Sequence, residues 1–181
     1  MNLITIDVET TMNGDEVSGL SHPMHPSNKV VLYGLFKTQT NHLWTGEELF
    51  KHNDIIWNDT DMLVGHNISF DLRYIYKNNP ALKKKLQSFK LWDTQLAEYL
   101  LTAQQTRWAS LDKLCEKYKL PLKDNEVSAF FAKGYGADHV PRVMLKTYLE
   151  HDLKVTTEIA KAQMMEAYKL NIFPLIAVSY T

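Results

Sequence analysis

The alternation of apolar and polar residues predicts strands at the start of the chain and helices toward its end. Residues 3–9 (LITIDVE) are rich in β-branched side chains and predict a strand close to the N-terminus. The following residues, 10–29, combine glycine, proline, serine and histidine with scattered charge, which predicts a long loop. Further strands are expected at 30–36, 42–44, 62–65 and 91–92, with a possible bulge at Gly34.

Helical periodicity and N-terminal capping residues place the helices. We expect helices at 47–52, 70–77, 83–85, 94–101 and 111–118. Asp93 and Ser110 stand where helix N-caps belong. The longest helix is expected to begin near Pro141, because no glycine or proline then interrupts the chain until Pro174. The order of elements predicts an α/β fold with a mixed sheet, in a single domain spanning 1–181. The end at 171–181 is apolar enough either to pack against this domain or to have continued into something longer.

Composition and charge limit the functions that the chain can have. The 181 residues are 45% apolar and carry a formal net charge of -1, which argues against gripping long duplexes through many phosphate contacts. A site for a few nucleotides stays compatible with that charge. Cys115 is the only cysteine, which excludes an internal disulfide and a cysteine-rich zinc site. Without an 18-residue apolar run or a signal peptide, we expect a soluble cytoplasmic protein with no membrane partner.

Two carboxylates lie on one face of the first predicted strand. Side chains alternate between the faces of a strand, so Asp7 and Glu9 point the same way. They repel each other, and a divalent cation is a natural counter-charge. The alternative is an edge strand on which both acids are solvated.

A second polar pair follows the predicted strand at 62–65. Asn67 and Asp71 are four residues apart, which places both on one side of a helix start. Either they belong to a functional site, or Asn67 caps the helix and Asp71 interacts with its positive end.

The third signal is one aspartate on an apolar helical stripe. Positions spaced by three, four and seven residues form this stripe, which consists of Leu145, Tyr148, Leu149, Asp152, Val155, Thr156 and Ile159. A buried aspartate is costly unless it is paired or binds a metal. Tyr148 precedes Asp152 by one turn, so its hydroxyl can reach the same site. The alternative is an aspartate at the helix rim, bonded to a loop amide.

Together these pairs resemble the three motifs of the DEDD 3′-5′ exonucleases, in order and approximate separation. The likeness covers residues 7–152 and is greatest to the proofreading exonuclease domain of family A DNA polymerases, particularly phage enzymes. The histidine branch of that superfamily places a histidine five residues before the last aspartate, where this chain has Thr147. Tyr148 fills the position of the tyrosine branch, so the chain resembles a tyrosine-type member.

The resemblance implies a ribonuclease H-like fold and a hydrolase that removes nucleotides from DNA 3′ ends, releasing 5′-monophosphates. It implies proofreading or another duty in DNA replication, with a single-stranded 3′ end and a DNA polymerase as partners. Two divalent cations, Mg²⁺ or Mn²⁺, would be held by four carboxylates, those of Asp7, Glu9, Asp71 and Asp152. Tyr148 would orient the attacking water, and Asn67 and the backbone of Thr10 would contact the terminal nucleotide. For a phage protein, the compartment would be the host cytoplasm.

The sequence leaves open the nucleic acid that is cut, whether the chain is catalytic, and whether it is a separate protein. A 3′-5′ exoribonuclease of the same superfamily would carry the same motifs, because sugar choice depends on contacts to the 2′ position. A non-catalytic module that binds a polymerase or nucleic acid would be expected to lack one carboxylate, and none is missing. The chain has no room for palm, fingers and thumb, so it is either a separately encoded exonuclease or a domain cut from a polymerase.

Overall fold

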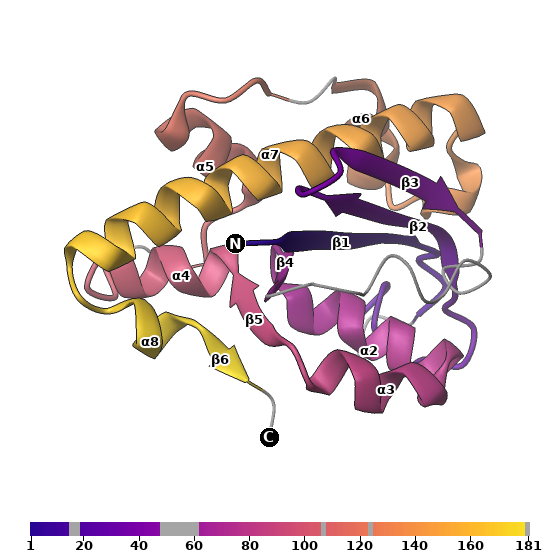
Figure 1. Ribbon diagram of the computed structural model, residues 1–181. Coiled ribbons are helices and arrows are strands. Elements are labelled where there is room, and N and C mark those ends of the chain that lie inside the picture. Colours follow the sequence, from indigo (N-terminus) through magenta and orange to yellow (C-terminus); the bar gives the residue numbers. More distant parts are fainter. Residues whose placement is uncertain (15–18, 48–61, 106–107, 123–124, 180–181) are drawn as a thin grey trace.

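A mixed sheet of six strands organises the part of the chain that the structure describes. The computed structural model describes residues 1–14, 19–47, 62–105, 108–122 and 125–179. Its strands are β1 (Leu3–Thr10), β2 (Val30–Lys37), β3 (His42–Gly46), β4 (Met62–Gly65), β5 (Lys90–Asp93) and β6 (Val178–Ser179). They lie in the order β3-β2-β1-β4-β5-β6 (Figure 1). β1 is antiparallel to β2 and parallel to β4, and β5 is parallel to β4 and antiparallel to β6.

Helices cover both faces of this sheet, as in the ribonuclease H-like fold. The long helix α7 crosses one face, while α2 and α3 cover the opposite face (Figure 1). The helices are α2 (Ile68–Asn78), α3 (Pro80–Gln87), α4 (Thr94–Leu101), α5 (Leu111–Tyr118), α6 (Asn125–Ala132), α7 (Arg142–Lys169) and α8 (Phe173–Ile176), with a 3₁₀ turn at Ala137–His139. No helix among the described residues is long and apolar enough to span a membrane. The predicted α/β class and mixed sheet are confirmed.

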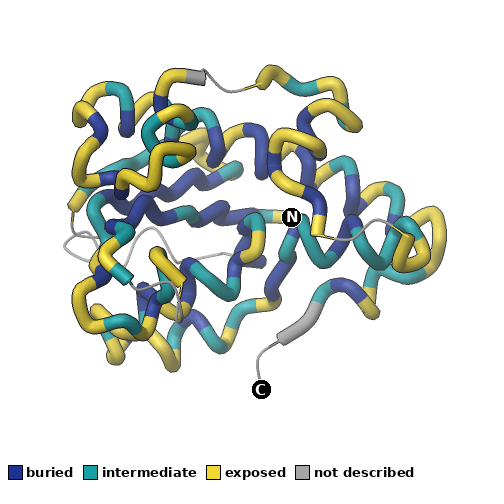
Figure 2. Tube along the Cα trace, turned by 180° about the vertical axis from the view of Figure 1, so that it is seen from behind, coloured by how far each residue is buried: buried dark blue, intermediate teal, exposed yellow. Residues whose placement is uncertain are grey.

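The strand β1 is the centre of the sheet and divides its side chains between two cores. Ile4, Ile6 and Val8 are buried against residues of α2 and α3. The alternate positions face α7, and the hydroxyl of Thr5 is hydrogen-bonded to that of Thr157 on the helix. Figure 2 shows that burial follows the strands and the inward sides of the helices.

Most predicted elements are present with small differences at their ends. The first strand and the helix after Asp93 match the expected ranges within one residue. The apolar C-terminal segment packs as expected, since Phe173 stacks on the fully buried Trp92 with ring centroids 5.3 Å apart. The helix expected at 47–52 lies, apart from its first residue, outside the described residues.

The expected bulge at Gly34 is wrong, and this glycine has a different role. Gly34 pairs in regular register with Asp7, whereas the irregularity in pairing lies between Glu9 and Thr10. A Cβ atom at position 34 would lie 2.7 Å from Leu153 Cδ1 and 2.9 Å from Leu149 Cγ. The absence of a side chain therefore lets α7 approach the sheet closely beside Asp7.

We expect Gly34→Val to destabilise the protein by about 1–3 kcal/mol, because its side chain would collide with those of Leu149 and Leu153. Urea denaturation measures this change in the free energy of unfolding. Leu149→Ala, which opens space at the same contact, is the partner variant of a double-mutant cycle. The double variant should be more stable than the sum of the two single losses predicts, and strict additivity would contradict the proposed close approach.

Candidate active site

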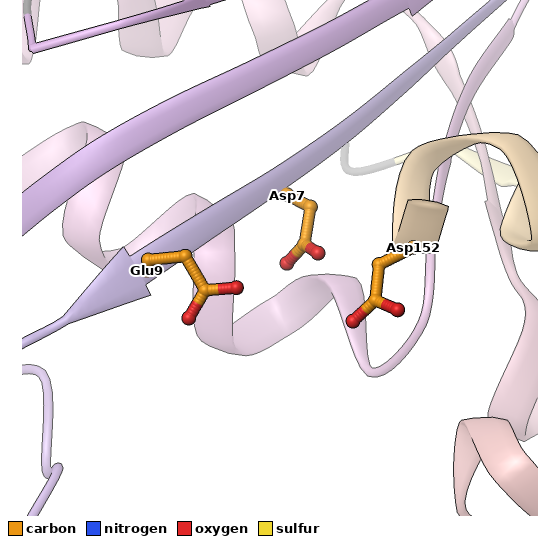
Figure 3. Close-up of side chains that lie close together, drawn as sticks. All are labelled: Asp7, Glu9 and Asp152. Carbon is orange, nitrogen blue, oxygen red and sulfur yellow. The ribbon is translucent and has the colours of Figure 1, made fainter. Parts of the chain in front are cut away.

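Three carboxylates from distant parts of the chain converge on the face of the sheet covered by α7. One oxygen each from Asp7, Glu9 and Asp152 lies within 4.8 Å of the other two. Figure 3 shows the two side chains of β1 and the side chain of α7 pointing toward one another. Glu9 is only 8% exposed and Asp152 only 5%, while Asp7 is half-buried. We call these three residues the acid cluster.

Two regular elements hold the acid cluster in place. The alternation along β1 directs Asp7 and Glu9 to the same face, as the sequence predicted. On α7, Asp152 stands between Leu149 and Leu153, which are fully buried and pack against the sheet at Gly34. The predicted apolar stripe is present, because Leu145, Leu149, Val155, Thr156 and Ile159 are all buried. The side chains of the cluster are therefore positioned by packing that is independent of any ligand.

The chemistry of the acid cluster fits a divalent cation. Two like unit charges about 4 Å apart repel by roughly 4 kcal/mol at an effective dielectric constant of about 20, so three close carboxylates call for a counter-charge. Carboxylate oxygens are the donors that hard cations such as Mg²⁺ prefer. Among the described residues, this is the group of three acidic side chains that can hold a metal ion.

Asp71 lies next to the acid cluster but is not part of it. It is 3% exposed, near the start of α2, and its Oδ1 accepts a hydrogen bond from the Val8 N–H at 3.0 Å. Strand β4 pairs with β1 only at Leu3–Thr5. Beyond that point β4 leaves the edge of β1 open, and Asp71 accepts a backbone hydrogen bond there. Burial, followed by the nearby charge of Asp7, raises the pKa of Asp71 well above its usual value. Asp71 and Asp7 therefore interact directly.

Asn67 occupies the residue before α2 in a left-handed conformation, with φ 56° and ψ 45°. The sequence left open whether its side chain caps the helix. It does not: the Asn67 side chain makes no capping hydrogen bond, and the Phe70 N–H donates to the Asn67 backbone carbonyl at 2.9 Å. The carboxylate of Asp93 accepts hydrogen bonds from the backbone N–H groups of Asn67 and Ile68, at 2.9 and 3.1 Å. The Asn67 side chain is exposed and accepts a hydrogen bond from Ser69 at 3.3 Å.

Thr10 ends β1 at the irregular pairing and is buried. Its side chain is hydrogen-bonded to the hydroxyl of Tyr74, which donates to the Ser21 carbonyl at 2.9 Å. The Lys77 Nζ of α2 donates to three carbonyls of the same loop, those of Pro23, His25 and Asn28, at 2.9–3.2 Å. The segment that follows the first two acids is thus tied to α2 by hydrogen bonds from the side chains of Tyr74 and Lys77.

Tyr148 borders a pocket on α7, one turn before Asp152. Its ring meets Phe131 edge-on, with centroids 5.8 Å apart. The pocket has a volume of about 300 Å³ and is lined by residues of α6 and α7, which are Glu126, Val127, Val143, Met144, Thr147, Tyr148 and His151. Tyr148 thus connects this largely apolar pocket to the helical turn that carries Asp152, about 5.4 Å further along the axis of α7.

The sequence did not reveal two positions that support the site residues. Asp93 was expected to cap one helix, whereas its carboxylate also accepts hydrogen bonds at the start of α2. Gly34 was expected to form a bulge, whereas the absence of its side chain makes room for α7. The local signal for Asp93 was its place at the end of a predicted strand, whereas its position beside Gly65 follows from strand pairing.

We expect the metal-free Asp71→Asn variant to be more stable than the wild type at neutral pH. Because the pKa of Asp71 is raised in the folded protein, its stabilising contribution is present at acidic pH and is lost as the pH rises through that pKa. An asparagine stays neutral and can still accept the Val8 N–H.

Urea denaturation in EDTA at about pH 7.5 and about pH 4 tests this expectation, with the advantage of the variant present at the first and smaller at the second. If the wild type were instead more stable than the variant at neutral pH, the pKa of Asp71 would not be raised in the folded protein.

Comparison with known proteins identifies the family of this chain. A model of the DNA polymerase A exonuclease family, described as 3′-5′ exonuclease, matches residues 27–166. That range includes Asn67, Asp71, Tyr148 and Asp152, while Asp7, Glu9 and Thr10 precede it. No significant match is found among curated protein sequences.

Two solved structures share the fold at low sequence identity. The apo form of a nuclease aligns with a TM-score of 0.65 and 13% identity, covering 96% of this chain and 77% of the nuclease. Phi29 DNA polymerase in a complex with primer-template DNA aligns with a TM-score of 0.53 and 13% identity. The second alignment covers 94% of this chain and 32% of the polymerase. From the extent of the family match, this chain belongs to the 3′-5′ exonuclease family of DNA polymerase A.

Proposed function

We propose that this protein hydrolyses phosphodiester bonds at the 3′ ends of single-stranded DNA and releases 5′-monophosphates. The observation that carries the proposal is the acid cluster, in which Asp7, Glu9 and Asp152 lie within 4.8 Å of one another in a member of an exonuclease family. In support of a DNA substrate, one solved structure with this fold is a DNA polymerase bound to primer-template DNA. Proofreading beside a polymerase is the duty that fits this substrate.

We assign two divalent cations, Mg²⁺ or Mn²⁺, to Asp7, Glu9, Asp71 and Asp152. The acid cluster supplies three closely spaced carboxylates, and Asp71, in contact with Asp7, supplies the fourth. When bound, the cations offset the carboxylate charge, promote ionisation of the attacking water and stabilise negative charge on the leaving 3′ oxygen. In the reaction, a water oxygen bonds to phosphorus, the bond from phosphorus to the 3′ oxygen breaks, and that oxygen gains a proton.

The remaining site residues bind and orient the substrate. The Tyr148 hydroxyl orients the attacking water, from a ring held in place against Phe131. Asn67, exposed at the start of α2, contacts the terminal nucleotide, and the backbone of Thr10 contacts it where β1 ends. The pocket between α6 and α7 is large enough to accept part of a nucleotide beside Tyr148. The composition agrees with such a small site, since the chain has no excess of positive charge for binding long duplexes.

The direct test of the proposal compares matched DNA and RNA oligonucleotides, labelled at the 5′ end, with Mn²⁺ and with EDTA. We expect stepwise shortening of the DNA from its 3′ end in Mn²⁺ and none in EDTA. Faster shortening of the RNA would replace the DNA assignment by an exoribonuclease. Intact oligonucleotides together with no heat of Mn²⁺ binding in a calorimeter would favour a non-catalytic module.

We expect Asp7→Asn and Asp152→Asn each to lower kcat by about 100- to 1000-fold, because each removes a negative charge that holds the cations. Both variants should fold, since losing a carboxylate relieves repulsion in the metal-free protein. Glu158→Gln is the matched control, because Glu158 lies on the same helix but is exposed and paired with Lys161. Wild-type kcat in either cluster variant would refute the site.

We expect Tyr148→Phe to lower kcat by about 10- to 100-fold with little change in Mn²⁺ affinity, because only the hydroxyl that orients the water is lost. The ring contact with Phe131 is kept, so the melting temperature should be unchanged. Single-turnover cleavage and calorimetry measure the two quantities. An unchanged rate would remove Tyr148 from the reaction.

A further inference from the structure

The carboxylate of Asp93 joins the beginnings of two helices. Its Oδ1 accepts hydrogen bonds from the N–H groups of Gln95 and Leu96 in α4, at 2.9 and 3.4 Å. The same oxygen accepts the Asn67 N–H at 2.9 Å, and Oδ2 accepts the Ile68 N–H at 3.1 Å. A single side chain thus caps α4 and also binds the turn that leads into α2.

The next residue, Thr94, extends this contact along the same turn. Its Oγ1 donates to the Gly65 carbonyl at 3.3 Å and is hydrogen-bonded to His66 Nδ1 at 2.9 Å. Asp93 and Thr94 therefore contact every residue from Gly65 to Ile68, which we call the 65–68 turn. We call the two residues of β5 and α4 the clamp.

The parallel pairing of β4 and β5 brings the clamp and the 65–68 turn together. Gly65 is the register partner of Asp93, so both strands end at the same level. The turn is tight at this point, because a Cβ atom on Gly65 would lie 2.8 Å from the Cβ of Ile68. Asn67 follows in the left-handed region, a backbone conformation that asparagine tolerates better than most residues.

The 65–68 turn sets the position of two residues that the proposed function uses. Asp93 fixes the backbone N–H groups of Asn67 and Ile68, and the Asn67 side chain makes no capping hydrogen bond, so that side chain is not committed to the N-terminus of α2. Asp71 is placed by the start of α2, which begins at Ile68. Its carboxylate meets the Val8 N–H at the open edge of β1.

We infer that Asp93 is a positioning residue for hydrolysis at the 3′ end. It holds the 65–68 turn so that Asn67 faces the substrate and Asp71 reaches Asp7. The inference rests on the proposed function. The hydrogen bonds of Asp93 in this turn go to the backbone N–H groups of Asn67 and Ile68, so it acts on the Asn67 amide and the Asp71 carboxylate through the backbone. Displacing a reacting group by about 1 Å can cost about 100-fold in rate, so a small rotation of α2 has a measurable effect.

Asp93→Asn separates this role from simple helix capping. An asparagine keeps one oxygen for the amides of Gln95 and Leu96 and remains a good N-cap for α4. Its NH₂ group, however, replaces the oxygen that accepts the Ile68 N–H, and two donors then face each other. Ser110→Ala is the matched control, because it removes the cap of α5, a helix that carries no proposed site residue.

The experiment combines backbone hydrogen exchange with steady-state kinetics on a 5′-labelled DNA oligonucleotide in Mn²⁺. In Asp93→Asn we expect the Ile68 amide to exchange at least about tenfold faster while the Gln95 amide changes little. We expect kcat/KM to fall by about 10- to 100-fold, through a higher KM from Asn67 and a lower kcat from Asp71. Ser110→Ala should lower the melting temperature and leave kcat/KM unchanged.

The outcomes distinguish the positioning role of Asp93 from the proposed function of the protein. An Asp93→Asn protein with a loosened Ile68 amide and wild-type kcat/KM would overturn the positioning role and leave Asp93 as a structural cap. Unchanged exchange at Ile68 would overturn the clamp itself. A wild-type protein that shortens no oligonucleotide would instead overturn the proposed function, independently of the exchange result.

Discussion

The close approach of α7 to the sheet at Gly34 is the constraint on which the rest of the site depends. Leu149 and Leu153 pack where a side chain on β2 would otherwise stand, directly beside Asp7 in the neighbouring strand. Asp152 lies between these two leucines in the sequence and is carried to the face that bears Asp7 and Glu9. Apolar packing thereby forces together charges that repel, and it does so before any cation or substrate is present.

The other parts of the site are fixed by backbone hydrogen bonds to carboxylates. Asp71 accepts the Val8 N–H where β4 no longer pairs with β1, and Asp93 accepts four N–H groups at two helix starts. Both arrangements use the ends of β4 and α2, on the side of the sheet opposite α7. The acid cluster thus lies on the α7 side of the sheet, while Asp71 comes from α2 and reaches Asp7 of β1.

The sequence predicted the elements whose signals are local. Alternation along 3–9 placed Asp7 and Glu9 on one face, and the apolar stripe of the last helix marked Asp152 as anomalous. The role of Gly34 could not be predicted, because a glycine within a strand gives the same sequence signal whether it forms a bulge or lets a helix pack closely against the sheet. The second bond set of Asp93 and the position of Asp71 outside the acid cluster depend on which strands pair, which is a non-local property.

The most direct test of this account is the anomalous scattering of Mn²⁺ soaked into crystals of the protein with a short DNA oligonucleotide. The account predicts strong peaks between Asp7, Glu9 and Asp152, with carboxylate oxygens at roughly 2 Å and the DNA 3′ end beside them. Manganese bound only elsewhere, or a 3′ end bound far from these three side chains, would contradict the assignment of the acid cluster as the catalytic centre.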